Sequence, residues 1–134
     1  MDITSLIPQR KPIIMVDKII DHTDEKTSTS LIIKKTNIFV EEDFFQSSGL
    51  IEHIAQSSAA RMGMKTIKQG KKPLLGYIAS IKNLSINRLP KIGETILTDI
   101  IQTNQINNIT VIRGESKIDD IVVSSCELKV FIEE

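Results

Sequence analysis

The sequence predicts an α+β fold in which an antiparallel sheet of about six strands wraps around one long helix. β-branched residues dominate the segments before residue 36 and after residue 73. Between them, apolar residues recur at spacings of three and four over 49–69, which is the period of a helix. The later β-rich segments are joined by short turns, which favour antiparallel pairing. A sheet curved around the helix is the simplest way to bury it.

The first segments predict a hairpin followed by a loop. Residues 12–20 are rich in Ile and Val and read as a buried strand, and residues 21–26 are polar and turn-like. Residues 27–35 carry Thr, Ser and Ile, which predicts the return strand. Residues 37–48 have no clear period, so we expect a loop whose aromatic side chains turn inward.

The helix expected over 49–69 has small residues on several faces, which predicts that other backbone approaches it closely from more than one side. Ser47 and Ser48 are candidate caps for its start, and Gly70 for its end. Four long strands follow, over 74–87, 95–105, 108–118 and 121–132. They are separated by turns that contain Pro-Lys-Ile-Gly, Asn-Asn and Asp-Asp.

Length and composition limit the classes of function. The 134 residues fit one domain, 1–134, and 17 basic side chains balance 17 acidic ones, so no nucleic-acid partner is expected. No apolar run approaches the ~20 residues that span a bilayer, and the start lacks the features of a signal peptide. One Cys and two His cannot supply a Cys/His zinc set, and no phosphate-binding Gly-rich loop is present. We expect a soluble cytoplasmic protein without metal or cofactor.

Glu52 is the most informative position for chemistry. In the first turns of the helix, its carboxylate could merely complement the positive end of the helix dipole. It also shares a helical face with Gln56, Ala59 and Gly63. If that face borders an apolar pocket, Glu52 could deliver or accept a proton. The amides of Gly49 and Leu50, at the same helix start, could polarise a bound carbonyl.

Two segments carry a family resemblance. Residues 6–19, Leu-Ile-Pro-Gln-Arg-Lys-Pro-Ile-Ile-Met-Val-Asp-Lys-Ile, resemble the opening strand of the 3-hydroxyacyl-acyl-carrier-protein dehydratases, which have the hotdog fold. Residues 49–59, Gly-Leu-Ile-Glu-His-Ile-Ala-Gln-Ser-Ser-Ala, resemble their helix motif. The strand after the helix and the turn at 89–94 are also similar, so the resemblance spans nearly the whole chain. It looks closer to the divergent, pigment- and polyene-associated branch than to the housekeeping enzymes.

The resemblance implies a single hotdog domain that dehydrates a 3-hydroxyacyl thioester in fatty acid or polyene-type biosynthesis. Glu52 would then be the acid that protonates the departing hydroxyl, and Gly49, Leu50 and Gln56 would bind the substrate. The family's base is a His in the loop before the helix, but residues 37–44 here contain no His, and Gln9 stands where the opening motif has one. The remaining candidate is His53, which points about 100° away from Glu52 around the helix. It is either a catalytic base or a helix-surface or interface residue.

Two other functions stay open at this stage. One is a hotdog acyl thioesterase, for which Glu52 and Gln56 would suffice, and the other is a non-catalytic acyl-binding partner subunit that lacks the base. The resemblance implies a homodimer or a dimer-based hexamer, because relatives pair their sheets at the site.

A basic cluster follows the site along the chain. The implied partner is an acidic acyl carrier protein that bears the substrate, and it could dock on these cations. The alternative is a solvated helix end whose cations complement the dipole. The residues concerned are Arg61, Lys65, Lys68, Lys71 and Lys72.

Overall fold

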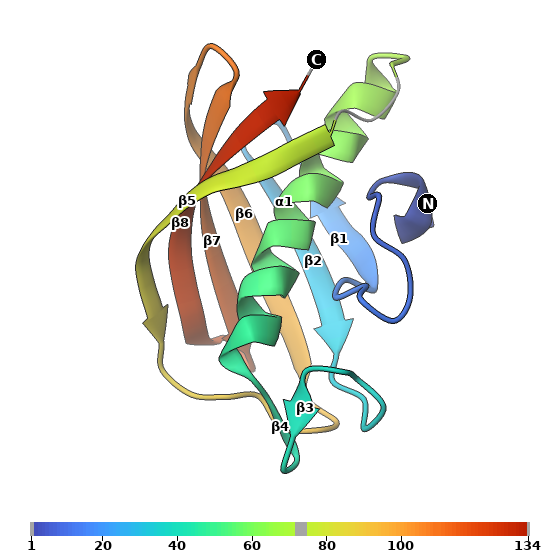
Figure 1. Cartoon of the computed structure of the whole chain (residues 1–134), viewed down its shortest axis with the longest axis vertical. Helices are drawn as coiled ribbons and strands as arrows, with labels where there is room; N and C mark the ends of the chain where they lie inside the picture. Colours follow the sequence, from blue (N-terminus) through green and yellow to red (C-terminus); the bar gives the residue numbers. More distant parts are fainter. Residues whose placement is uncertain (1, 72–74, 134) are drawn as a thin grey trace.

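A six-stranded antiparallel sheet curves around one long helix in the computed structural model, which describes residues 2–71 and 75–133. The strand order is β1-β2-β6-β7-β8-β5, and α1 lies across the sheet (Figure 1). The predicted fold class is therefore confirmed. The bounds are β1 Lys18–His22, β2 Lys26–Ile32, α1 Ser47–Lys68, β5 Leu75–Ile86, β6 Thr95–Ile106, β7 Ile109–Ile118 and β8 Ile121–Glu133.

The core lies between α1 and the sheet. Leu50 and Ile54 of α1 are fully buried, and they belong to clusters with Ile96, Ile100 and Leu128 of the strands. These contacts bury the predicted apolar side of the helix. Within the described residues, no helix is long and apolar enough to cross a membrane.

The small residues of α1 permit close contacts, as predicted. A Cβ atom at Gly63 would collide with the backbone carbonyl of Leu6, which follows the short 3-10 helix Ile3–Ser5. A Cβ at Gly49 would approach the ring of Phe45 to 2.6 Å. Because glycine occupies both positions, the N-terminal segment and the loop before α1 pack directly on the helix backbone.

The predicted strand over 12–20 is wrong for residues 12–17, since β1 begins only at Lys18. The backbone of residues 13–15 is irregular and finds its partners on α1 instead of on a neighbouring strand. Gln56 bonds to the carbonyl of Ile13 and to the amide of Met15, and His53 bonds to the carbonyl of Met15. The side chains of Gln56 and His53 thus supply this segment with hydrogen bonds that a neighbouring strand would otherwise supply.

The loop before α1 contains a small hairpin, β3 (Val40–Glu41) and β4 (Phe44–Phe45). Phe45 is fully buried, as expected for the loop aromatics, whereas Phe44 is 37% exposed. The turn between β5 and β6 supports this hairpin, because the amide of Phe45 donates to the carbonyl of Pro90.

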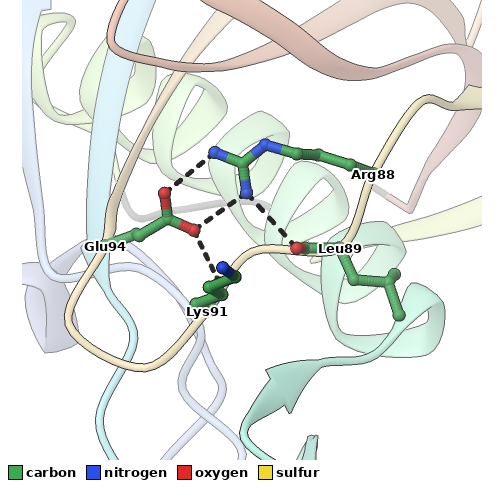
Figure 2. A network of polar contacts seen from close by, with 4 residues as sticks. All are labelled: Arg88, Leu89, Lys91 and Glu94. Atoms are coloured by element: carbon green, nitrogen blue, oxygen red, sulfur yellow. Dashed lines mark hydrogen bonds and ion pairs between the residues drawn. The ribbon is translucent and has the colours of Figure 1, made fainter.

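Glu94 ties that turn together (Figure 2). Its carboxylate accepts two hydrogen bonds from Arg88, at 2.9 and 2.8 Å, and one from the amide of Lys91 at 2.7 Å. These donors lower the pKa of Glu94 to about 2, with the Arg88 hydrogen bond as the main cause. The turn at 88–94 is thereby fixed beneath the start of α1.

Candidate active site

A cavity of about 260 Å³ lies between α1, the N-terminal segment and the edge of the sheet. Its walls combine small and apolar side chains with a few polar ones. The residues that line it are Leu6, Pro8, Gln9, Glu52, Ala55, Ser58, Ala59, Met62, Gly76, Ile78 and Val130. It is therefore an apolar pocket with one acidic group among its described residues.

Glu52 lines this cavity from the second turn of α1, on the helix face that sequence spacing indicated. The side chain is half-buried, and its Oε1 accepts a hydrogen bond of 2.8 Å from Nε2 of Gln56 one turn later. This contact fixes the carboxylate at the cavity wall. A carboxyl group held at an apolar pocket can give a proton to a bound molecule.

Gln56 lies behind Glu52 and not at the cavity wall, where the sequence had placed it for substrate binding. Its side chain is fully buried and does not line the cavity. Oε1 accepts from the amide of Met15 at 2.6 Å, and Nε2 donates to the carbonyl of Ile13 at 2.8 Å as well as to Glu52. One amide group therefore joins the N-terminal segment to the candidate acid.

His53 is neither at the surface nor at the cavity, so both positions expected for it are wrong. Its side chain is fully buried, with Nδ1 2.6 Å from the carbonyl of Met15 and Nε2 2.6 Å from Oγ1 of Thr98. A carbonyl only accepts, so Nδ1 carries the proton and Nε2 accepts from Thr98, whose oxygen then accepts from Ser116. Burial lowers the pKa of His53 to about 4.

The amides of Gly49 and Leu50 are not free to polarise a carbonyl. Both donate to the carbonyl of Gln46, at 3.0 and 3.1 Å, because α1 begins at Ser47, two residues before the predicted start. Neither Ser47 nor Ser48 caps the helix, since both lie inside it and the cap position is Gln46. Gly49 and Leu50 are buried, and their place is explained by packing against Phe39 and Phe45.

Gln9 is a residue of the site that sequence reasoning noted only as a substitution. It lines the same cavity as Glu52, and its buried Oε1 has no hydrogen-bond partner within the described part of the chain. A buried acceptor without a partner is costly unless a ligand or water supplies a donor. The signal in the sequence was its position in the opening motif, where the resembling family has a His.

The basic residues do not form one exposed cluster. Arg61 is 3% exposed and donates to Thr27 and to the carbonyls of Thr23 and Asp24 in the β1–β2 hairpin. Lys65 is half-buried, and Lys68 and Lys71 are exposed. Lys72 lies outside the described residues. Arg61 therefore holds the hairpin onto α1 and is not part of an open docking surface.

Comparison with known structures defines the class as the hotdog fold. One chain from the dehydratase heterocomplex ApeI:P of Xenorhabdus doucetiae superposes with a TM-score of 0.93 over 100% of this chain and 92% of that one, at 14% identity. A hypothetical thioesterase with coenzyme A from Streptococcus pneumoniae gives a TM-score of 0.68 over 87% and 84%, at 12% identity. Both likenesses show a shared fold.

The chain belongs to the ApeP-like family, described as ApeP dehydratase, whose sequence model matches residues 1–134. The curated relatives include the 3-hydroxyacyl-acyl-carrier-protein dehydratase FabZ of Lactobacillus helveticus, 30% identical over 98% of this chain and 90% of that protein. The FabZ of Shewanella woodyi is 26% identical over 95% and 87%. The resemblance to this dehydratase family is confirmed, and so is the main functional prediction of a dehydratase.

Proposed function

We propose that this chain contributes the proton donor to a 3-hydroxyacyl thioester dehydratase, and that Glu52 is that donor. One observation carries the proposal: Glu52 lines the apolar cavity and its carboxylate is held there by Gln56. The substrate's C3 hydroxyl would lie against Glu52, and Gln9, whose Oε1 has no partner among the described residues, would lie beside the same substrate.

The proposed reaction removes one molecule of water. A base takes the proton from C2, the electron pair of that C–H bond forms the C2–C3 double bond, and the C3–O bond breaks. Glu52 gives its proton to the departing oxygen, which leaves as water, and the product is a 2-enoyl thioester. The proton on the base then returns to Glu52 through solvent, so the site is restored.

We propose that the base comes from a second, different chain. The sequence holds two His, and His53 is buried with both ring nitrogens engaged. The other, His22, does not line the Glu52 cavity; its Nδ1 lies 2.7 Å from Oγ1 of Thr27. Neither His of this chain is free at the chain's own cavity, whereas a different hotdog subunit could bring one. The structural likeness to a dehydratase heterocomplex supports this assembly.

The free edge of the sheet offers a surface for that second chain. β5 is one of the two outer strands, the other being β1, and the exposed side chains of β5 include Tyr77, Ile78, Ile81 and Leu84. An unpaired edge with apolar side chains invites strand pairing. Since Gly76 and Ile78 of β5 also line the Glu52 cavity, a chain paired there would lie next to the site.

The product formed by the native assembly tests the function. The chain is tagged in its host, isolated with its accompanying subunits, and incubated with 3-hydroxyacyl and saturated acyl pantetheine thioesters. We expect water loss from the 3-hydroxyacyl substrate without thiol release. Thiol release from either substrate would instead show a thioesterase, and no reaction of either would contradict the proposal.

We further propose that the substrate arrives on an acyl carrier protein and that Lys68 and Lys71 help to dock it. Both are exposed near the end of α1, where they can attract an acidic partner. The double variant Lys68→Glu/Lys71→Glu should slow turnover of carrier-linked substrate about tenfold at low salt and leave pantetheine substrates unchanged. The exposed pair Lys34→Glu/Lys35→Glu is the control for net charge. Equal slowing by both double variants, or of both substrate types, would contradict docking at this place.

A further inference from the structure

A second cavity, of about 220 Å³, lies further along α1, between the helix and β6, β7 and β8. Ser58 and Met62 of α1 line both this cavity and the one that contains Glu52. On β8, Val130 lines the first and Ile132, two residues on along the same strand, lines the second. The two cavities are therefore neighbours that follow one another along the helix.

The two cavities differ in chemistry. The α1 side of the first cavity is bordered mostly by small and apolar side chains, among them Ala55, Ala59 and Met62. Most of the residues that line the second cavity are polar, and two of them are basic. Its polar lining includes Arg61, Lys65, Gln69, Gln102, Gln105 and Thr110. Among the described residues, no carboxylate lines it.

Arg61 lines this cavity, and one donor of its side chain has no partner among the described residues. Its two terminal nitrogens bond to the β1–β2 hairpin, but its buried Nε has no partner within the described residues. Burial lowers the pKa of Arg61, and the carboxylates of Asp24 and Glu25 in the β1–β2 hairpin oppose that shift. Neither carboxylate lines the cavity. A buried guanidinium N–H without an acceptor is favourable only when a ligand or water supplies one.

Other cations gather near the same place. The pKa of His22 is lowered first by burial and then by the charges of Lys68, Arg61 and Lys65, against the opposing effect of Asp24. This side of the C-terminal half of α1 is therefore positively charged. The Lys65 ammonium group lines the cavity and the charge of the buried Arg61 adjoins it, which suits a carboxylate.

We propose that the second cavity binds the far end of the substrate's acyl chain, and that this end carries a negatively charged group such as a carboxylate. The inference rests on the proposed function, which places the reacting C2 and C3 atoms at Glu52. From residue 52 to residue 61 the helix rises about 14 Å, which an extended chain can cross. The apolar side chains of the first cavity suit hydrocarbon, whereas the amides of a pantetheine arm would be left without partners there.

Binding of two unreactive ligands to the native assembly tests the proposal. They are saturated acyl pantetheine thioesters of equal chain length, one ending in a methyl group and the other in a carboxylate. Titration calorimetry should show that the carboxylate-ended ligand binds about tenfold more tightly. Lys65→Met should remove that preference, and Gln105→Leu should reduce it. Lys68→Met, an exposed neighbour that does not line the cavity, should keep it.

Equal or tighter binding of the methyl-ended ligand by the wild type would overturn the proposal. So would an equal loss of preference in Lys65→Met and Lys68→Met, since that pattern indicates general surface charge. These measurements need no turnover. Failure of the proposed function would appear separately, as no water loss from a methyl-ended 3-hydroxyacyl thioester.

Discussion

Acidification from pH 6.5 to about 4 is expected to remove about 3 kcal/mol of stability through His53 alone. The ring is fully buried, and its pKa falls from 6.5 to about 4 on folding, mainly through desolvation. The hydrogen bond to Met15 and the charge of Asp17 oppose that shift. Between these pH values the unfolded chain binds a proton that the folded chain does not. The stability is thus complete above pH 6.5 and is lost as the pH falls toward 4.

Urea unfolding at half-unit steps of pH measures this loss. His53→Gln keeps a donor and an acceptor without a titrating ring, so it should be less stable than wild type at pH 7 and depend less on pH above 4.5. His22→Gln is the control, because the pKa of the half-buried His22 is lowered too. A steep profile in His53→Gln would show that another group causes the acid lability. Glu94, whose pKa is lowered from 4.5 to about 2, adds its own loss of stability only as the pH falls below about 4.5, so the variants are compared above that pH.

Most of the fold could be predicted because the signals are local. The helical period over 49–69 and the alternation within the later strands come from neighbours in sequence, and the observed α1 (Ser47–Lys68) and β5–β8 match those segments closely. The segment at 13–16 could not be predicted in the same way. Its Ile-Ile-Met-Val composition favours a strand, but its partners are side chains about 40 residues away on α1.

The place of Glu52 on a cavity-lining face of the helix was predictable from the sequence, and the surroundings of Glu52 were less so. Its helix spacing and motif placed the carboxylate on the correct face, and the cavity there agrees. His53 and Arg61 were placed wrongly, although a signal existed. His53 is three residues after the buried Leu50, and Arg61 is seven after the buried Ile54, which puts both on the core side of the helix. For a polar residue at such a position, its spacing from buried apolar residues predicts burial better than its own polarity does.

Glu52→Gln is expected to lower dehydration of a 3-hydroxyacyl thioester by at least about 100-fold, because general acid–base groups contribute ~10²–10⁴-fold. The new side chain keeps the shape and an oxygen that accepts from Gln56, so positioning is preserved while the proton is lost. Stability should change by about 1 kcal/mol or less, since only the interaction with the helix dipole is removed. Glu41→Gln, an exposed carboxylate on β3 outside the cavity, should retain full activity.

The rate of water loss by the native assembly that carries Glu52→Gln, compared with wild type and with Glu41→Gln, tests the central claim most directly. Light scattering and thermal unfolding confirm that the three assemblies have the same mass and stability. We expect a loss of at least about 100-fold in the Glu52 variant alone. Turnover within about twofold of wild type in a correctly assembled Glu52→Gln protein would show that the proton donor is another residue.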